Sequence, residues 1–228
     1  GDENMTIQKK VFGMVCCFIL AGAWMQISAR PERFSPYYIQ KKTLFDILPD
    51  EQGEIIFLGD SITDGGEWAE MFNDLRIKNR GISGDTTDGI LARVDEVTAA
   101  KPAGVFLMIG INDLADGVPA ETVLNNIKRI VQQIARQSPD TCVYIQSVLP
   151  VSDRYTLFPH HVSKGREIES VNAGLRAFCR NRGLAYIDLF ALFRTKEGRL
   201  DPRYTNDGLH LTGAGYVLWM GALADYLR

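Results

Sequence analysis

One serine, one aspartate and one histidine in this chain have the types and spacing that nucleophilic catalysis needs. Ser61 follows closely on the apolar run 55–58. His210 stands three residues after Asp207, so on a turn the carboxylate can accept a hydrogen bond from the imidazole Nδ1–H. The other ring nitrogen would then be free to take a proton from the Ser61 hydroxyl. Such a constellation would transfer an acyl group through a covalent serine intermediate.

Two further residues could stabilise the oxyanion that this reaction forms. Gly84 lies in the turn after the second apolar run, where the lack of a Cβ lets a backbone N–H approach a ligand closely. Asn112 follows the third apolar run and could donate its side-chain amide to the same point. Together with the backbone N–H of Ser61, they would make an oxyanion hole of three donors.

Each of these signals has a plainer interpretation when it is taken alone. A serine between a strand and a helix is usually a helix N-cap. A glycine or asparagine after a strand often serves only to form a tight turn. A histidine in a D-x-x-H sequence is more often structural or merely exposed. The set becomes specific because its members fall at the ends of successive chain segments.

Short apolar runs alternate with helical patterns after residue 35. This alternation predicts βαβ units, with a parallel sheet covered by helices on both faces. In such sheets the ligand crevice lies beyond the carboxyl ends of the strands, where the candidate residues stand. The predicted strands are 55–58, 76–79, 105–109, 142–148 and 185–189, and the predicted helices are 36–48, 86–100, 120–137, 165–181 and 216–227.

Four sequence blocks, in order, resemble the SGNH hydrolases, also called the GDSL esterase/lipase family. The blocks are Gly-Asp-Ser at 59–61, Gly-Ile-Ser-Gly-Asp-Thr at 81–86, Gly-x-Asn-Asp at 110–113 and Asp-x-x-His at 207–210. The resemblance runs from about Glu54 to the C-terminus. It departs from the name-giving pattern at Ile62, where some members have leucine, and this is a mild change.

The resemblance implies a fold, a site and a reaction. The fold is a flavodoxin-like three-layer α/β/α sandwich around a five-stranded parallel sheet. Ser61 is the nucleophile, His210 the base and Asp207 its orienting acid, and no metal or organic cofactor is implied. Ser61, Gly84 and Asn112 would form the oxyanion hole. The spacing looks most like the platelet-activating-factor acetylhydrolase-like and carbohydrate-esterase branches.

The resulting prediction is a serine esterase that removes short acyl groups, above all O-acetyl groups on carbohydrates. Its partner would be a small acyl ester such as an acetylated sugar. Two alternatives stay open: a lysophospholipase or thioesterase, and a catalytically silent carbohydrate-binding domain of the same fold. The chain lacks the G-x-S-x-G motif, which argues against the ordinary α/β-hydrolase arrangement. It also lacks G-x-x-x-x-G-K-[ST] and G-x-G-x-x-G, which argues against a phosphate- or nucleotide-binding domain. A net charge of -3 without a basic cluster speaks against nucleic acid.

The first 29 residues have the pattern of a secretory signal. Lys9 and Lys10 precede an apolar run at 11–25, and the small residue Ala29 follows. The run is shorter than the roughly 20 residues that span a bilayer comfortably. We therefore expect a signal or apolar segment at 1–29, a hydrolase domain at 30–228, and a secreted or periplasmic protein. Membrane attachment through the uncleaved segment is the alternative.

Other reactive side chains receive supporting roles. Cys142 and Cys179 are predicted to be buried free thiols, with a single disulfide as the alternative. Asp60 and Asp113 are predicted to support the loops by hydrogen bonding rather than to take part in the chemistry. A metal cluster of Asp60, Asp64, Asp85 and Asp113 is the less favoured interpretation of the acids near the blocks. The pair His160-His161, with Tyr155, Phe158 and Pro159, is predicted to lie in a solvated loop or, alternatively, to line the substrate mouth.

Overall fold

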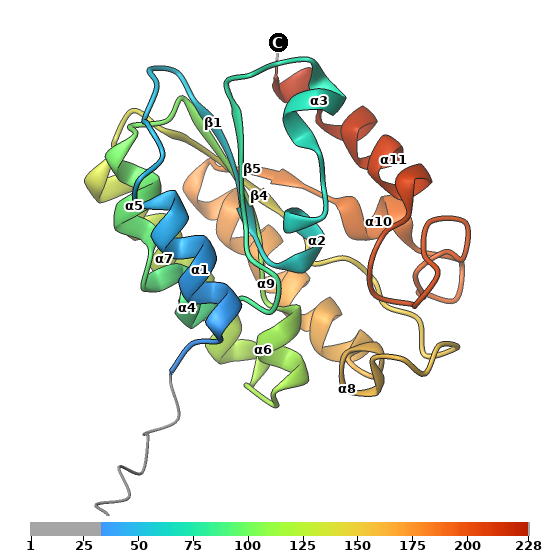
Figure 1. Cartoon of the computed structure of the whole chain (residues 1–228). Helices are drawn as coiled ribbons and strands as arrows, with labels where there is room; N and C mark the ends of the chain where they lie inside the picture. Colours follow the sequence, from blue (N-terminus) through green and yellow to red (C-terminus); the bar gives the residue numbers. More distant parts are fainter. Residues whose placement is uncertain (1–32, 228) are drawn as a thin grey trace, which may run out of the picture. The chain divides into compact units, whose positions relative to one another are not determined.

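Five parallel strands form the centre of the fold in the computed structural model, which describes residues 33–227 (Figure 1). Their order across the sheet is β2-β1-β3-β4-β5. This is the flavodoxin-like order, and the predicted fold class is confirmed. The strands are β1 (Ile55–Gly59), β2 (Ile77–Gly81), β3 (Gly104–Met108), β4 (Cys142–Gln146) and β5 (Ala185–Ile187).

Helices cover both faces of the sheet. The helices α4, α5, α7 and α9 pack beside one another on one face, and α3 and α11 contact each other on the opposite face (Figure 1). The helices are α1 (Pro36–Phe45), α2 (Ser61–Asp64), α3 (Trp68–Phe72), α4 (Thr87–Leu91), α5 (Val94–Ala99), α6 (Ile111–Ala115), α7 (Ala120–Gln137), α8 (Pro159–Val162), α9 (Gly165–Arg182), α10 (Leu189–Phe193) and α11 (Gly213–Leu223).

The core lies between the sheet and these helices. Every residue of β1 and β3 is buried, as expected for strands that are covered on both faces. Helix α7 turns one apolar stripe to the sheet, because its buried side chains recur at helical spacing. These side chains are Val123, Ile127, Ile130, Val131 and Ile134.

The predicted helix 86–100 is in fact two helices, so that prediction was wrong in detail. Thr86 is the N-cap of α4, and its hydroxyl accepts a hydrogen bond from the Gly89 N–H. The chain then leaves helical geometry at Arg93, which has φ -132° and ψ 11°, before α5 begins. At this break the Arg93 side chain is buried and donates hydrogen bonds to the carbonyls of Gly59 and Arg80, near the ends of two strands.

The end of the sheet also differs from the prediction. Strand β5 stops at Ile187, and Asp188 caps a short helix, α10, by accepting a hydrogen bond from the Ala191 N–H. The closing helix α11 runs from Gly213 to Leu223, so it begins three residues before the predicted start at 216. A 3-10 helix, Ala224–Tyr226, continues it almost to the predicted end at 227. Helix propensity predicts the ends of helices poorly, because the last turns of a helix depend on caps and packing.

The two cysteines of the described region are both free thiols. Cys179 is buried in α9, as predicted, but Cys142 is exposed, which corrects the prediction for that residue. Cys142 opens β4 opposite Gly104 of β3, whereas pairing with β5 begins two residues later, at Tyr144. One side of Cys142 therefore has no neighbouring strand.

The predicted signal segment at 1–29 lies outside the described residues, and it stays a prediction. Within residues 33–227, none of the helices combines the length and apolarity that a bilayer crossing requires.

Candidate active site

The carboxyl ends of three neighbouring strands place three of the predicted site residues at one edge of the sheet. Ser61 follows β1, Gly84 lies in the loop after β2, and Asn112 is the second residue of α6, which follows β3. Strand β1 lies between β2 and β3, so the segments that follow the three strands converge. The segment before α11 adds Asp207 and His210 to the same place.

Ser61, His210 and Asp207 form a continuous chain of hydrogen bonds. The Ser61 Oγ lies 3.0 Å from His210 Nε2, and His210 Nδ1 lies 2.7 Å from Asp207 Oδ2. A carboxylate can only accept, so Nδ1 carries the proton and Nε2 is the acceptor in the neutral ring. The arrangement therefore lets His210 take the hydroxyl proton of Ser61.

The carboxylate of Asp207 is held in its ionised form. Its Oδ1 accepts hydrogen bonds from the backbone N–H groups of Leu209 and His210 at 2.8 and 2.7 Å. Partial burial alone would raise the pKa of Asp207, but these donors and the imidazole outweigh burial and lower it. An ionised Asp207 stabilises the positive charge that His210 acquires when it takes a proton.

The capping role at the start of α2 belongs to Asp60 and not to Ser61. Ser61 is the first helical residue, and the Asp60 carboxylate accepts the Ile62 N–H at 3.0 Å. The alternative interpretation of Ser61 as an N-cap is therefore wrong. Its hydroxyl is left to bond His210.

Three N–H donors belong to residues that line the cleft beside Ser61. The backbone N–H groups of Ser61 and Gly84 have no acceptor among residues 33–227. Gly84 has φ +80°, a left-handed conformation that favours glycine. The Asn112 amide donates one hydrogen to the Asp85 carbonyl at 2.7 Å and keeps its second for a ligand. The three groups could together bind an oxyanion.

These groups line one cleft of about 520 Å³. Phe158 forms part of its wall and meets the His210 ring edge-on, with centroids 5.0 Å apart. A larger groove between α9 and α10 carries arginines and acids but none of the predicted site residues. The cleft is lined by Ser61, Ser83, Gly84, Asn112, Asp116, Phe158, His161, Leu209 and His210.

The residues that were predicted to form the 155–161 loop have different surroundings in the structure. His161 and Phe158 line the cleft, so the favoured interpretation of a solvated loop was wrong for these two. His160 is exposed, and Tyr155 lines a different hollow beside Arg199. His161 Nε2 lies 3.0 Å from Asn112 Oδ1, a contact the sequence did not predict. The only hint of this contact in the sequence was the histidine pair itself, which follows Pro159 in the short helix α8.

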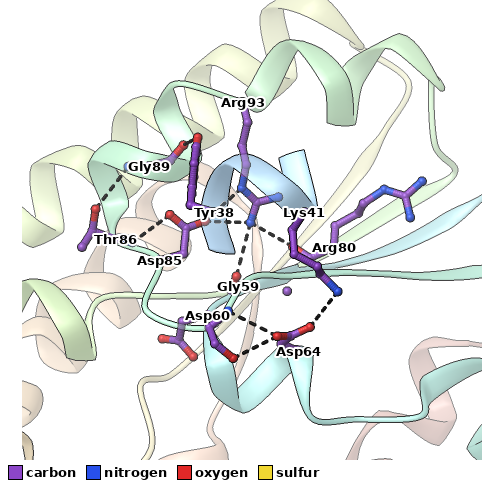
Figure 2. A network of polar contacts seen from close by, with 12 residues as sticks. Tyr38, Lys41, Gly59, Asp60, Asp64, Arg80, Asp85, Thr86, Gly89 and Arg93 are labelled. Atoms are coloured by element: carbon purple, nitrogen blue, oxygen red, sulfur yellow. Dashed lines mark hydrogen bonds and ion pairs between the residues drawn. The ribbon is translucent and has the colours of Figure 1, made fainter. Parts of the chain in front are cut away.

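A buried arginine ties the loops of the site to the sheet. Figure 2 shows the Arg93 guanidinium bonded to the carbonyls of Gly59 and Arg80 and to the Asp85 carboxylate. Gly59 and Arg80 lie at the ends of β1 and β2, and Asp85 directly follows Gly84. Arg93 thus fixes the turn that carries the Gly84 N–H relative to β1, the strand that leads into Ser61.

The four aspartates near the sequence blocks each serve the loops. Asp64 accepts hydrogen bonds from Ser83 and from Tyr37 of α1. It also forms an ion pair with Lys41 (Figure 2). Asp113 accepts from the backbone N–H of Thr87. The predicted support role is confirmed for Asp60, which caps α2, and for Asp113. Asp85 is paired with Arg93, a role that the sequence did not predict. No cluster of three or more metal-binding side chains occurs within residues 33–227.

Burial of Asp60 makes stability depend on pH. Burial raises the pKa of Asp60 to about 7, although the Ile62 N–H works against this shift. In the unfolded chain the same group titrates near pH ~4. Between these pH values the folded protein binds the extra proton, so the contribution is complete below pH ~4 and is lost as the pH rises to about 7.

We expect Asp60→Asn to reduce this pH dependence while keeping an acceptor that caps α2. Wild type should lose about 2–3 kcal/mol more unfolding free energy between pH 5 and pH 8 than the variant does, because only wild type must ionise the buried group. Urea unfolding of both proteins at the two pH values measures the difference. Equal losses would show that Asp60 does not titrate in this range.

Comparison with known proteins identifies the family of this chain. Residues 57–218 match the GDSL-like lipase/acylhydrolase family. The chain is 30% identical over 184 residues to platelet-activating factor acetylhydrolase IB subunit alpha1 of Bos taurus, covering 78% of this chain and 76% of that protein. It is 28% identical over 174 residues to the alpha2 subunit of Rattus norvegicus, covering 74% and 73%.

Solved structures agree with the fold. A GDSL-like lipase from Bacteroides thetaiotaomicron is 25% identical with a TM-score of 0.74, covering 83% of this chain and 96% of that one. An acetylxylan esterase from Geobacillus stearothermophilus shares the fold at 19% identity and a TM-score of 0.62, covering 78% and 95%.

The fold, the arrangement of the site and the comparisons together show that this chain is an α/β ester hydrolase. The chain belongs to the GDSL-like lipase/acylhydrolase family.

Proposed function

We propose that this enzyme hydrolyses short acyl esters through an acyl-enzyme on Ser61. The observation that carries the proposal is the hydrogen-bonded chain from Ser61 Oγ through His210 to Asp207. It opens into a cleft that also receives Gly84 and Asn112. No other described part of the chain brings a hydroxyl, an imidazole and a carboxylate into one such series.

In the first half of the reaction, Ser61 Oγ attacks the ester carbonyl while His210 Nε2 takes its proton. The negative charge that develops on the carbonyl oxygen is stabilised by the N–H groups of Ser61 and Gly84 and by the Asn112 amide. The imidazolium, held by Asp207, then returns the proton to the leaving alcohol. Water, activated by the same imidazole, hydrolyses the acyl-enzyme and frees Ser61.

The lining of the cleft favours a short acyl group. Among its described lining residues, Phe158 and Leu209 are the large apolar side chains. The burial of each methylene of a longer chain needs apolar surface, and a cleft with so little of it gains little from extra carbons. The bovine and rat relatives are named acetylhydrolases, which supports the same acyl group.

Polar groups at the cleft suit a carbohydrate as the alcohol part. The Ser83 hydroxyl and the exposed Asp116 carboxylate lie with the Phe158 ring among the lining residues. Sugar hydroxyls need such hydrogen-bond partners, and the apolar face of a sugar ring packs on aromatic side chains. These contacts support acetylated sugars over lipids as substrates.

We expect p-nitrophenyl acetate to be the best of three test esters. Its kcat/KM should exceed that of the octanoate at least about tenfold, with the butyrate between them, because the longer chains lack matching apolar surface. Initial rates over a concentration series for the three esters measure this. A preference for octanoate would favour the lysophospholipase or thioesterase alternative. Absence of turnover with every ester would favour the catalytically silent binding domain.

A further inference from the structure

The Asn112 carboxamide is held at both of its ends. The Asp85 backbone carbonyl can only accept a hydrogen bond, so the group 2.7 Å from it is the Asn112 NH₂. This orientation turns the Asn112 Oδ1 toward His161, whose Nε2 lies 3.0 Å away. The flipped amide would place two carbonyl oxygens against each other and is excluded on that ground.

The contact also defines the proton position on His161. Asn112 Oδ1 is an acceptor, so His161 Nε2 carries the hydrogen and donates it. Burial lowers the pKa of His161, which keeps the ring neutral near neutral pH. A neutral donor orients the amide without adding a second positive charge beside His210.

The wall of the cleft holds His161 itself. It lies in α8, a helix that contacts α6, the element that carries Asn112. Phe158, just before α8, meets the rings of both His161 and His210 edge-on, with centroids 5.9 and 5.0 Å apart. His161 is therefore braced on one side by an aromatic ring and bonded on the other to Asn112.

We propose that His161 is a positioning residue that directs the free amide hydrogen of Asn112 to the oxyanion. An amide that bonds only Asp85 could swing about that single contact, whereas two opposed hydrogen bonds fix its plane. A donor acts on the transition state only when it is aligned before the charge develops. The inference rests on the proposed function, since it assigns His161 to the oxyanion hole described above.

The test is a double-mutant cycle on kcat for p-nitrophenyl acetate. We expect His161→Ala to lower kcat roughly tenfold with KM within about twofold, the size expected for loss of one neutral hydrogen bond. In an Asn112→Ala background the same change should have almost no further effect, because there is no amide left to orient. His161→Gln, whose amide can still donate to Asn112, should recover most of the activity. His160→Ala, next to it and exposed, is the matched control and should behave as wild type.

Several results would overturn this inference. A His161→Ala enzyme as fast as wild type, or an equal loss of kcat in both backgrounds, would show that His161 does not act through Asn112. If His161→Ala does not fold, as judged by its thermal melting, the His161→Gln variant decides: a kcat tenfold below wild type contradicts the inference. Failure of the proposed function is distinguishable, since Ser61→Ala would then retain the wild-type rate.

Discussion

Ser61→Ala should lower kcat for p-nitrophenyl acetate by at least about 10⁴-fold, because the acyl-enzyme cannot form without the hydroxyl. The fold should be preserved. The Ser61 hydroxyl bonds His210, while Asp60 caps α2, so alanine removes no support from the helix. Alanine is also a good helix former at the first helical position.

Two measurements on Ser61→Ala separate chemistry from folding. The melting midpoint should stay within roughly 3 °C of wild type, equivalent to no more than about 1 kcal/mol for a domain of this size. Ser170→Ala, which changes an exposed serine on α9, is the matched control and should keep full activity. An inactive variant that is also unfolded would indicate a structural role for Ser61, and a fully active one would remove it as the nucleophile.

Asn112→Ala should lower kcat by roughly two to three orders of magnitude. Its amide is the one side-chain donor of the proposed oxyanion hole, and the charge that it would stabilise exists only in the transition state. KM should change little, because the ground-state ester carbonyl is neutral. Steady-state kinetics on p-nitrophenyl acetate separate the two constants.

The matched control for Asn112 is Asn125→Ala, an exposed asparagine of α7. It should have wild-type kinetics. An Asn112→Ala enzyme with unchanged kcat would take Asn112 out of the oxyanion hole. A rise in KM with kcat preserved would instead indicate that Asn112 binds the substrate before reaction.

The residues proposed for the reaction were all predictable from the sequence. Ser61, Gly84 and Asn112 each follow an apolar run, and parallel strands bring their carboxyl ends to one edge of a sheet. The spacing of Asp207 and His210 allows one turn to join them. Strands and helix caps such as Ser35 and Thr86 can also be predicted from the local sequence, because they depend on residues only a few positions apart.

What the sequence could not reveal depends on contacts between distant segments. At the helix break, the Arg93 guanidinium bonds Gly59, Arg80 and Asp85, which are distant from one another in the sequence or from Arg93. Cys142 is exposed because β5 begins beyond it.

The contact between His161 and Asn112 joins residues 49 positions apart, and no spacing rule within one element predicts it. The fold class, the family and the residues that could react were predictable from the chain alone. The ends of the helices, the cap of α2 and the choice of His161 over His160 for the cleft depend on packing. Periodicity and caps act over a few residues, whereas packing selects, among several locally acceptable arrangements, the one that buries its polar groups with partners.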